Sequence, residues 1–218
     1  MYKELFSFLK GLKKNNHKEW FDKNRDQYQE LRTEFVGLVD QVIKYVSSID
    51  PEIGYIEAKH CIFRINRDIR FSKDKTPYKT HFSAFISEKG RKSFGPGYYI
   101  HLEPGGNSLI AGGVYLPDPE ALYKIRQEID YNGNELKAII KKPSFKNLFP
   151  FIDGEKLSRA PKGFSEDSEY IDLIKLKSFS IYTGISDEDV LKGNMEKFYK
   201  KGFKEMVVYN DFFRKALE

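Results

Sequence analysis

The spacing of the hydrophobic residues changes twice along this chain, and these changes restrict the possible fold more than any other feature. Over residues 3–13 and 17–48, apolar residues recur at steps of three and four, which predicts amphipathic helices. The second stretch is either one long helix or two helices that meet near Gly37, and Asn16 followed by Glu19 resembles a capping box at its start. We therefore expect the chain to begin with helices.

The middle of the chain instead contains short runs of β-branched and aromatic residues, separated by Gly, Pro and Asp. Short turns between such runs favour an antiparallel sheet. The predicted strands cover residues 59–66, 80–87, 97–103, 108–115 and, later in the chain, 179–183.

Helical spacing returns after Pro119 and again from Asp187, whereas residues 143–168 are rich in Pro, Gly and Lys and indicate a long ordered loop. Helices, then a sheet, then helices are typical of the α+β class. We predict a mostly antiparallel sheet packed against N-terminal and C-terminal helices, in a single domain over residues 1–218.

The composition excludes several classes of protein. Hydrophobic residues make up 40% of the chain, which is enough for a folded core and argues against disorder. Cys61 is the only cysteine, so no internal disulfide can form, and its apolar neighbours favour a buried, inert thiol. No stretch is long and apolar enough for a signal peptide or a membrane span. We expect a cytoplasmic protein without a membrane partner, and the sequence leaves its oligomeric state open.

Positive charge is concentrated in one segment, residues 64–79. This segment holds six basic and two acidic side chains, and therefore +4 of the formal net charge of +5. Apolar runs flank it on both sides, which ties it to the folded core. Because guanidinium groups suit two-point recognition of phosphate or carboxylate, we expect this segment to form an anion-binding site.

The alternation of side chains along an extended segment would place Arg64 and Arg70 on one face, with Lys73 and Lys75 closing over a bound anion. The competing interpretation is an ion-pair network that only braces the loop. Arg25 lies on a helical stripe that either packs on the sheet or reaches the same site. The predicted ligand-binding residues are Arg25, Arg64, Arg67, Arg70, Lys73, Lys75 and Lys79.

His101 and Glu103 form a second candidate site, because residues two apart on a strand share a face. They are candidates for an acid/base pair or for metal ligands. A metal site would need a further ligand, for which His60 and His81 are the candidates in predicted strands of the same sheet. The alternatives to a metal are an unmetallated polar site beside the cationic segment and simple structural hydrogen bonding, and we expect neither a metal nor a cofactor.

The glycines of this chain do not form a nucleotide-binding loop, because Gly95–Gly97 and Gly105–Gly106 do not lead into predicted helices. The sequence also lacks a nucleophile elbow and a zinc-protease helix motif. The expected partner is an anionic small molecule, or alternatively a nucleic acid, whose bases would stack on Phe71 and Tyr78. Whether the protein is an enzyme stays open.

The segment around these cations resembles a known family. The run from Phe63 to Ile65 and from Arg67 to Lys79, the residues Trp20, Phe21, Asn24, Arg25 and Tyr28, the stretch 97–106 and the positions Gly112, Gly113 and Pro117 carry the likeness. Together they are similar to the bacterial family catalogued as domain of unknown function 2461. The resemblance implies one domain that spans the chain, and it carries over no activity, substrate or catalytic residue.

Overall fold

The computed structural model describes residues 1–218 and has the predicted α+β architecture: helices at both ends and a four-stranded antiparallel sheet in the order β1-β2-β3-β4. The strands are β1 (Phe82–Ile86), β2 (Gly97–Leu102), β3 (Ser108–Val114) and β4 (Phe179–Ile185). No helix combines the length and the apolar character needed to cross a membrane.

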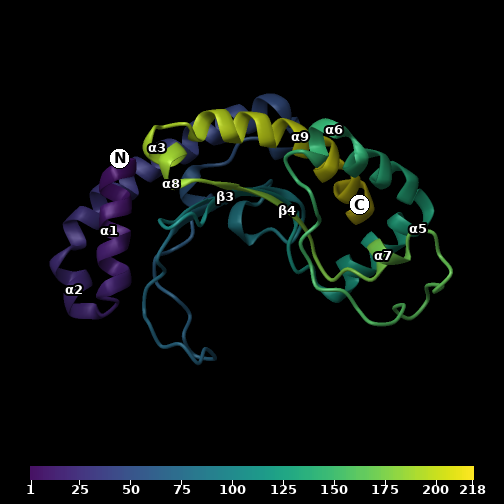
Figure 1. Ribbon diagram of the computed structural model, residues 1–218, viewed down its shortest axis with the longest axis horizontal. Coiled ribbons are helices and arrows are strands. Elements are labelled where there is room, and N and C mark those ends of the chain that lie inside the picture. The colour runs from purple at the N-terminus through teal and green to yellow at the C-terminus, as the bar shows by residue number, and fades with distance from the viewer. The chain divides into compact units, whose positions relative to one another are not determined.

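The helices in chain order are α1 (Tyr2–Lys14), α2 (Lys18–Lys23), α3 (Arg25–Ile49), α4 (Ala58–Cys61), α5 (Pro119–Lys141), α6 (Pro143–Lys146), α7 (Ile171–Ile174), α8 (Asp187–Leu191) and α9 (Met195–Leu217). Two short 3₁₀ helices, η1 (Pro51–Ile53) and η2 (Gly90–Lys92), complete the regular structure. Figure 1 shows these elements along the chain.

The chain forms two compact units that alternate along the sequence. The first unit contains Met1–Arg91, Tyr99–Ile110 and Gly184–Lys200, and the second contains Lys92–Tyr98, Ala111–Thr183 and Lys201–Glu218. The single domain expected over residues 1–218 stays a prediction.

In the first unit, α3 packs against β1 through its apolar stripe. The rings of Phe35 and Phe82 meet edge to face, with centroids 5.4 Å apart, and Tyr28 lies 5.8 Å from Phe82 on the same side. Because Phe82 points towards α3, the neighbouring His81 points to the opposite face of the sheet. This face of the sheet, opposite α3, carries one of the two candidate sites described below.

In the second unit, two buried polar side chains form hydrogen bonds with backbone groups. The amide of Asn210, which is fully buried, donates to the Gly97 carbonyl at 3.2 Å and accepts from the Gly113 amide at 3.0 Å. Arg126 of α5 donates to the carbonyls of Ile174 and Leu176 at 2.8 and 3.2 Å. Both side chains satisfy backbone groups that burial would otherwise leave unpaired.

Three local predictions are corrected by the structure. The predicted strand 59–66 is wrong over its first residues, which form α4, and its remainder makes only isolated bridges from Ile62 to Ala84 and from Asn66 to Tyr78. Burial explains this difference, because Ala58 and Cys61 are both buried and lie three residues apart, on one face of a helical turn.

Of the two alternatives for residues 17–48, neither one unbroken helix nor a bend near Gly37 is correct, since Gly37 lies inside α3 and the break falls at Asn24. The Asn24 side chain donates to the Trp20 carbonyl at 2.8 Å and so ends α2. The predicted capping box fails as well: Asn16 does not cap α2 but exchanges two hydrogen bonds, of 2.9 and 3.0 Å, with the backbone of Tyr78.

Candidate functional site

Residues 62–79, which we call the arm, form an extended excursion of the chain that projects from the rest of the first unit (Figure 1). At its base the arm joins the sheet, because the Phe63 amide donates to the Ser83 carbonyl at 3.0 Å. Further along, the Lys79 amide donates to Ile65 at 2.8 Å and the Arg67 amide to Pro77 at 2.9 Å. The arm is therefore an ordered, irregular hairpin.

Acidic residues and carbonyls of the arm hold three of its six basic side chains. Arg67 pairs with Asp74 and also donates to Thr76, and Arg70 bonds both oxygens of Asp68 at 2.9 and 2.7 Å. The hydrogen bonds from Arg70 lower the pKa of Asp68 to about 2. The third of these side chains is Lys75, which donates to the Ile69 carbonyl at 3.0 Å. These three side chains brace the arm in the way the competing interpretation expected.

The remaining cations of the arm are arranged differently. Lys73 is exposed and forms no ion pair, and the ammonium of Lys79 lies 5.1 Å from the centre of the Phe63 ring. Burial, and then the charge of Arg64, lower the pKa of Lys79. Arg64 itself forms no ion pair, so its guanidinium is available to a ligand.

Arg64 lines a cavity of about 270 Å³ between α3 and the base of the arm, which we call the cationic cavity. Its lining residues are Phe21, Arg25, Tyr28, Gln29, Arg32, Lys59, Ile62, Phe63, Arg64, Ile65, Asn66 and Arg91. The structure thus brings Arg25 and Arg64 together, whereas the other predicted ligand-binding residues do not line this cavity. Five of the lining residues are basic and none is acidic.

Two of these five cations have an acidic partner outside the cavity. Arg25 pairs with Asp22, and Lys59 pairs with Glu57 at 2.6 Å. The guanidinium of Arg91 donates to the Lys59 carbonyl at 2.9 Å. Arg32, like Arg64, forms no ion pair. The cavity therefore concentrates positive charge that the protein neutralises only in part.

Sequence reasoning missed three of the cavity's cations. Arg32 could have been found, because it follows Arg25 by seven residues and Tyr28 by four and so lies on the same helical face. Lys59 and Arg91 carry no such signal. They come from a short helix and a 3₁₀ turn that only the tertiary structure brings together.

The second candidate site lies on the face of the sheet opposite α3 and comprises His81, His101 and Glu103, which we call the histidine cluster. Along β2, Ile100 and Leu102 are fully buried, whereas Tyr99 and His101 are half-buried on the other face. His81 precedes β1, the neighbouring strand, and its ring centre lies 4.2 Å from that of His101.

Hydrogen bonds fix two members of this cluster. Nε2 of His101 lies 3.0 Å from Oε2 of Glu103, and Nδ1 of His101 lies 3.0 Å from the Tyr99 hydroxyl. The Thr80 hydroxyl donates to Oε1 of Glu103 at 2.7 Å. Neither ring nitrogen of His81 forms a hydrogen bond. His60, the other candidate ligand, lies on α4 beside Glu57 and is exposed.

The surroundings of the cluster also set its charge. Burial, and then the nearby His101, lower the pKa of His81 to about 4, and burial lowers the pKa of His101. For Glu103, burial alone would raise the pKa, but the hydrogen bonds from Thr80 and His101 outweigh it and the pKa falls. Near neutral pH the cluster therefore holds two neutral imidazoles and one carboxylate.

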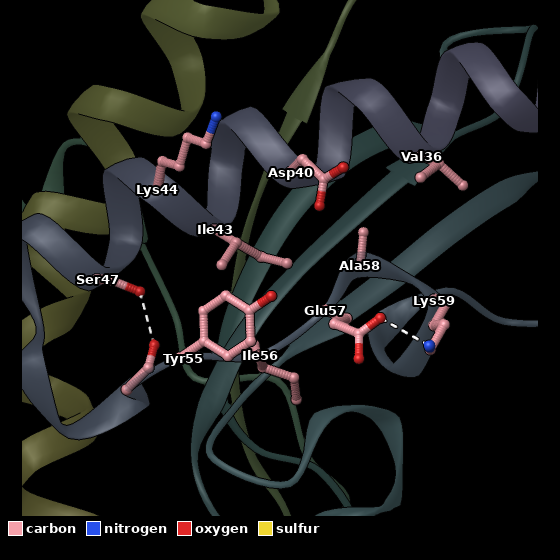
Figure 2. A pocket seen from close by; sticks show the side chains of 11 residues that line it. Val36, Asp40, Ile43, Lys44, Ser47, Tyr55, Ile56, Glu57, Ala58 and Lys59 are labelled. Atoms are coloured by element: carbon pink, nitrogen blue, oxygen red, sulfur yellow. Dashed lines mark hydrogen bonds and ion pairs between the residues drawn. The ribbon is translucent and has the colours of Figure 1, made fainter.

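A larger groove of about 710 Å³ lies between α3 and residues 54–59 (Figure 2). Its polar groups are largely paired: Ser47 donates to the Gly54 carbonyl at 3.0 Å, and Glu57 pairs with Lys59. Its charged side chains are two acids and two bases, and the rest of its lining is mostly apolar. This groove lacks the one-sided charge that distinguishes the cationic cavity.

Comparison with known proteins places the chain in a family. No similar curated protein and no similar solved structure was found. The sequence model of the family described as "Conserved hypothetical protein (DUF2461)" matches residues 4–212, which is nearly the whole chain. The match includes the arm, both sides of the cationic cavity and the histidine cluster, and the protein therefore belongs to the DUF2461 family.

Proposed function

We propose that the cationic cavity binds a small molecule that carries a phosphate or carboxylate group. The observation that carries this proposal is the charge of the lining: five basic side chains and no acidic one surround a space of about 270 Å³. Like charges held together repel one another, and a bound anion relieves this repulsion. A cluster of this kind is therefore poorly explained by structural bracing alone.

The types of donor support the same ligand class. Four of the five cations are arginines, whose planar groups can bond two oxygens of a phosphate or carboxylate at once. Arg32 and Arg64, which form no ion pair, line the cavity from two different elements, α3 and the arm. An anion bound by both would be held from both elements.

The size and the aromatic part of the lining narrow the ligand further. Drug-sized ligands fill pockets of roughly 300–1,000 Å³, so this cavity suits a small anion or the charged end of a larger molecule. Phe21, Tyr28 and Phe63 also line it and offer apolar surface beside the arginines. We expect a ligand with one or two anionic groups on a compact organic body.

Thermal unfolding tests this proposal. With the metal chelator EDTA present throughout, the protein is melted with pyrophosphate, phosphate, sulfate or citrate. A ligand at 100 times its Kd stabilises the folded state by about 2.7 kcal/mol, which corresponds to a rise in Tm of roughly 5–11 °C for a chain of this size. We expect such a rise with at least one of these anions.

Two matched variants locate the binding site. Arg64→Met removes a charge from the cavity lining, whereas Arg70→Met removes the same charge from the arm, where Arg70 pairs with Asp68 outside the cavity. The stabilisation by the anion should disappear in Arg64→Met and persist in Arg70→Met. Absence of a Tm rise with every anion, or its equal loss in both variants, would reject the cavity as the binding site.

Nucleic acid is a second candidate ligand, and the observation that favours it is the exposed aromatic ring of Phe71. This ring is 93% exposed near the end of the arm, and the Arg70 guanidinium lies 5.6 Å from its centre. Bases stack on such rings, and the affinity for a labelled single-stranded oligonucleotide would then fall with log salt at a slope of about −0.7 per phosphate contacted. Phe71→Ser should weaken this binding, and the lack of any binding at low salt would exclude it.

A further inference from the structure

We propose that His81, His101 and Glu103 bind a divalent transition-metal ion through two imidazoles and one carboxylate. Their potential ligand atoms all lie within 4.8 Å of one another. His101 lies in β2, Glu103 directly follows β2, and His81 directly precedes the neighbouring strand β1. This inference concerns a different site from the cationic cavity and does not depend on the function proposed for it.

The separation of the ligand atoms fits a bound ion. Nitrogen and oxygen ligands lie about 2.0–2.2 Å from zinc, so two ligands of one tetrahedral ion are separated by about 3.3–3.6 Å. Nε2 of His101 and Oε2 of Glu103 are 3.0 Å apart. An ion that binds both atoms replaces the hydrogen bond between them and requires them to move apart by about 0.3–0.6 Å.

The outer atoms of both residues already have the partners that metal ligands usually have. Nδ1 of His101 lies 3.0 Å from the Tyr99 hydroxyl, and Oε1 of Glu103 accepts a hydrogen bond of 2.7 Å from Thr80. Such contacts fix the orientation of a ligating imidazole or carboxylate and are a regular part of metal sites. They leave Nε2 and Oε2 directed at each other, where the ion would lie.

His81 is the residue that distinguishes a metal site from ordinary hydrogen bonding. His101 and Glu103 form a hydrogen bond with each other without a third residue, so their pairing does not explain the position of His81. The His81 imidazole is half-buried, its ring centre lies 4.2 Å from that of His101 in a tilted arrangement, and its ring forms no hydrogen bond. Its nitrogens reach the surface, and a metal ion would bind one of them. The sequence alone predicted no metal here, and the position of His81 is the reason for departing from that expectation.

The donor set also indicates the kind of ion. Imidazole nitrogens suit zinc, iron, nickel and copper, whereas magnesium and calcium prefer oxygen ligands. Three protein ligands leave at least one coordination position open, as in catalytic rather than structural zinc sites. His101 and Glu103 keep side-chain exposures of 14% and 18%, so water or a small molecule can reach the ion.

The test begins with untagged protein, because a polyhistidine tag binds the same ions. The protein is stripped with chelator and titrated calorimetrically with Zn²⁺, Mn²⁺ and, without oxygen, Fe²⁺. Co²⁺ is added in a parallel titration, where its visible absorption reports the ligand geometry. We expect one ion per chain for at least one metal, and no binding of Mg²⁺ at the same concentrations.

Variants then identify the ligands. His81→Ala, His101→Gln and Glu103→Gln should each abolish stoichiometric binding, and Tyr99→Phe should weaken it about 10–100-fold as a positioning residue. His60→Ala is the matched control, because His60 is exposed on α4 and lies outside the cluster. Circular dichroism and Tm establish that each variant is folded, and Glu103→Gln keeps the shape of the side chain.

Three results would overturn the inference. The first is that the stripped protein binds none of the four transition-metal ions stoichiometrically. The second is that His81→Ala binds the ion as tightly as the parent protein does, since His101 and Glu103 alone would then account for it. Equal loss of binding in His60→Ala would likewise place the ion elsewhere.

Discussion

The replacement of Gly90 by alanine should both destabilise the protein and weaken anion binding in the cationic cavity. Gly90 has φ of +57°, and a Cβ atom added there would lie 2.6 Å from the carbonyl oxygen of His60. Real Cβ atoms do not approach backbone so closely, so α4 or the turn at Gly90 must move. The guanidinium of the next residue, Arg91, bonds the Lys59 carbonyl, and this movement therefore displaces two cations of the cavity.

The expected loss of stability has two parts. A left-handed conformation costs a residue with a Cβ about 1–2 kcal/mol, and overpacking typically costs about 1–3 kcal/mol. A mid-range loss of about 3.5 kcal/mol lowers the Tm of a chain of this size by roughly 7–14 °C. Circular dichroism melts measure this change, and the Tm rise caused by the best anion should be smaller in the same variant.

Substitutions at two other glycines separate the cost of the left-handed conformation from the cost of overpacking. Gly106 also has positive φ, of +75°, but nothing lies within 4 Å of an added Cβ, so Gly106→Ala should lose only about 1–2 kcal/mol. Gly37 lies inside α3 with open space around it, and Gly37→Ala should gain about 0.5–1 kcal/mol. If Gly90→Ala melts at the same temperature as Gly106→Ala, the close approach to His60 does not exist and the reasoning fails.

Three further predictions concern the arm and the core. Asn16→Ala removes both hydrogen bonds to the Tyr78 backbone and should lower the free energy of unfolding in urea by about 1–3 kcal/mol; an unchanged value would contradict this link. Arg67→Met should open the arm locally and so raise the rate of trypsin cleavage at Lys73 roughly 3–10-fold, without a change in Tm. An unchanged rate would show that Arg67 does not brace the arm. Burial raises the pKa of the Cys61 thiol to about 11, so a thiol reagent at pH 8 should modify it only after unfolding, and rapid modification of the native protein would refute this.

The fold could be predicted from the sequence wherever a long periodic pattern was present. The helical spacing of residues 3–13 predicted α1 within one residue at each end, and the run of aromatic and β-branched residues over 97–103 predicted β2. Short elements were predicted less well, because tertiary contacts decide them. The predicted strand 59–66 rested on apolar residues such as Ile62 and Phe63, which follow α4, whereas the burial of Ala58 and Cys61 selects a helical turn before them.

The candidate sites could likewise be predicted only in part from the sequence. Net charge identified the arm correctly as the place where cations gather, but it could not separate braced cations from available ones. Arg67 and Arg70 have acidic partners within a few residues, whereas Arg64 faces a cavity built from α3, α4 and the turn at Arg91. Only the tertiary structure assembles these walls, and a single sequence contains no periodic signal for them.

One aromatic contact connects the two proposed sites. The Phe63 ring lines the cationic cavity and meets the Tyr99 ring edge to face at 6.3 Å, and the Tyr99 hydroxyl lies 3.0 Å from His101. An anion-binding pocket alone would be consistent with a binding protein, and a metal site alone would be consistent with several functions. Both sites together, joined through Phe63 and Tyr99, would be best explained by an enzyme that holds an anionic substrate with arginines and acts on it with a metal ion. The anion measurements in chelator and the metal titrations therefore decide jointly between a binding protein and an enzyme.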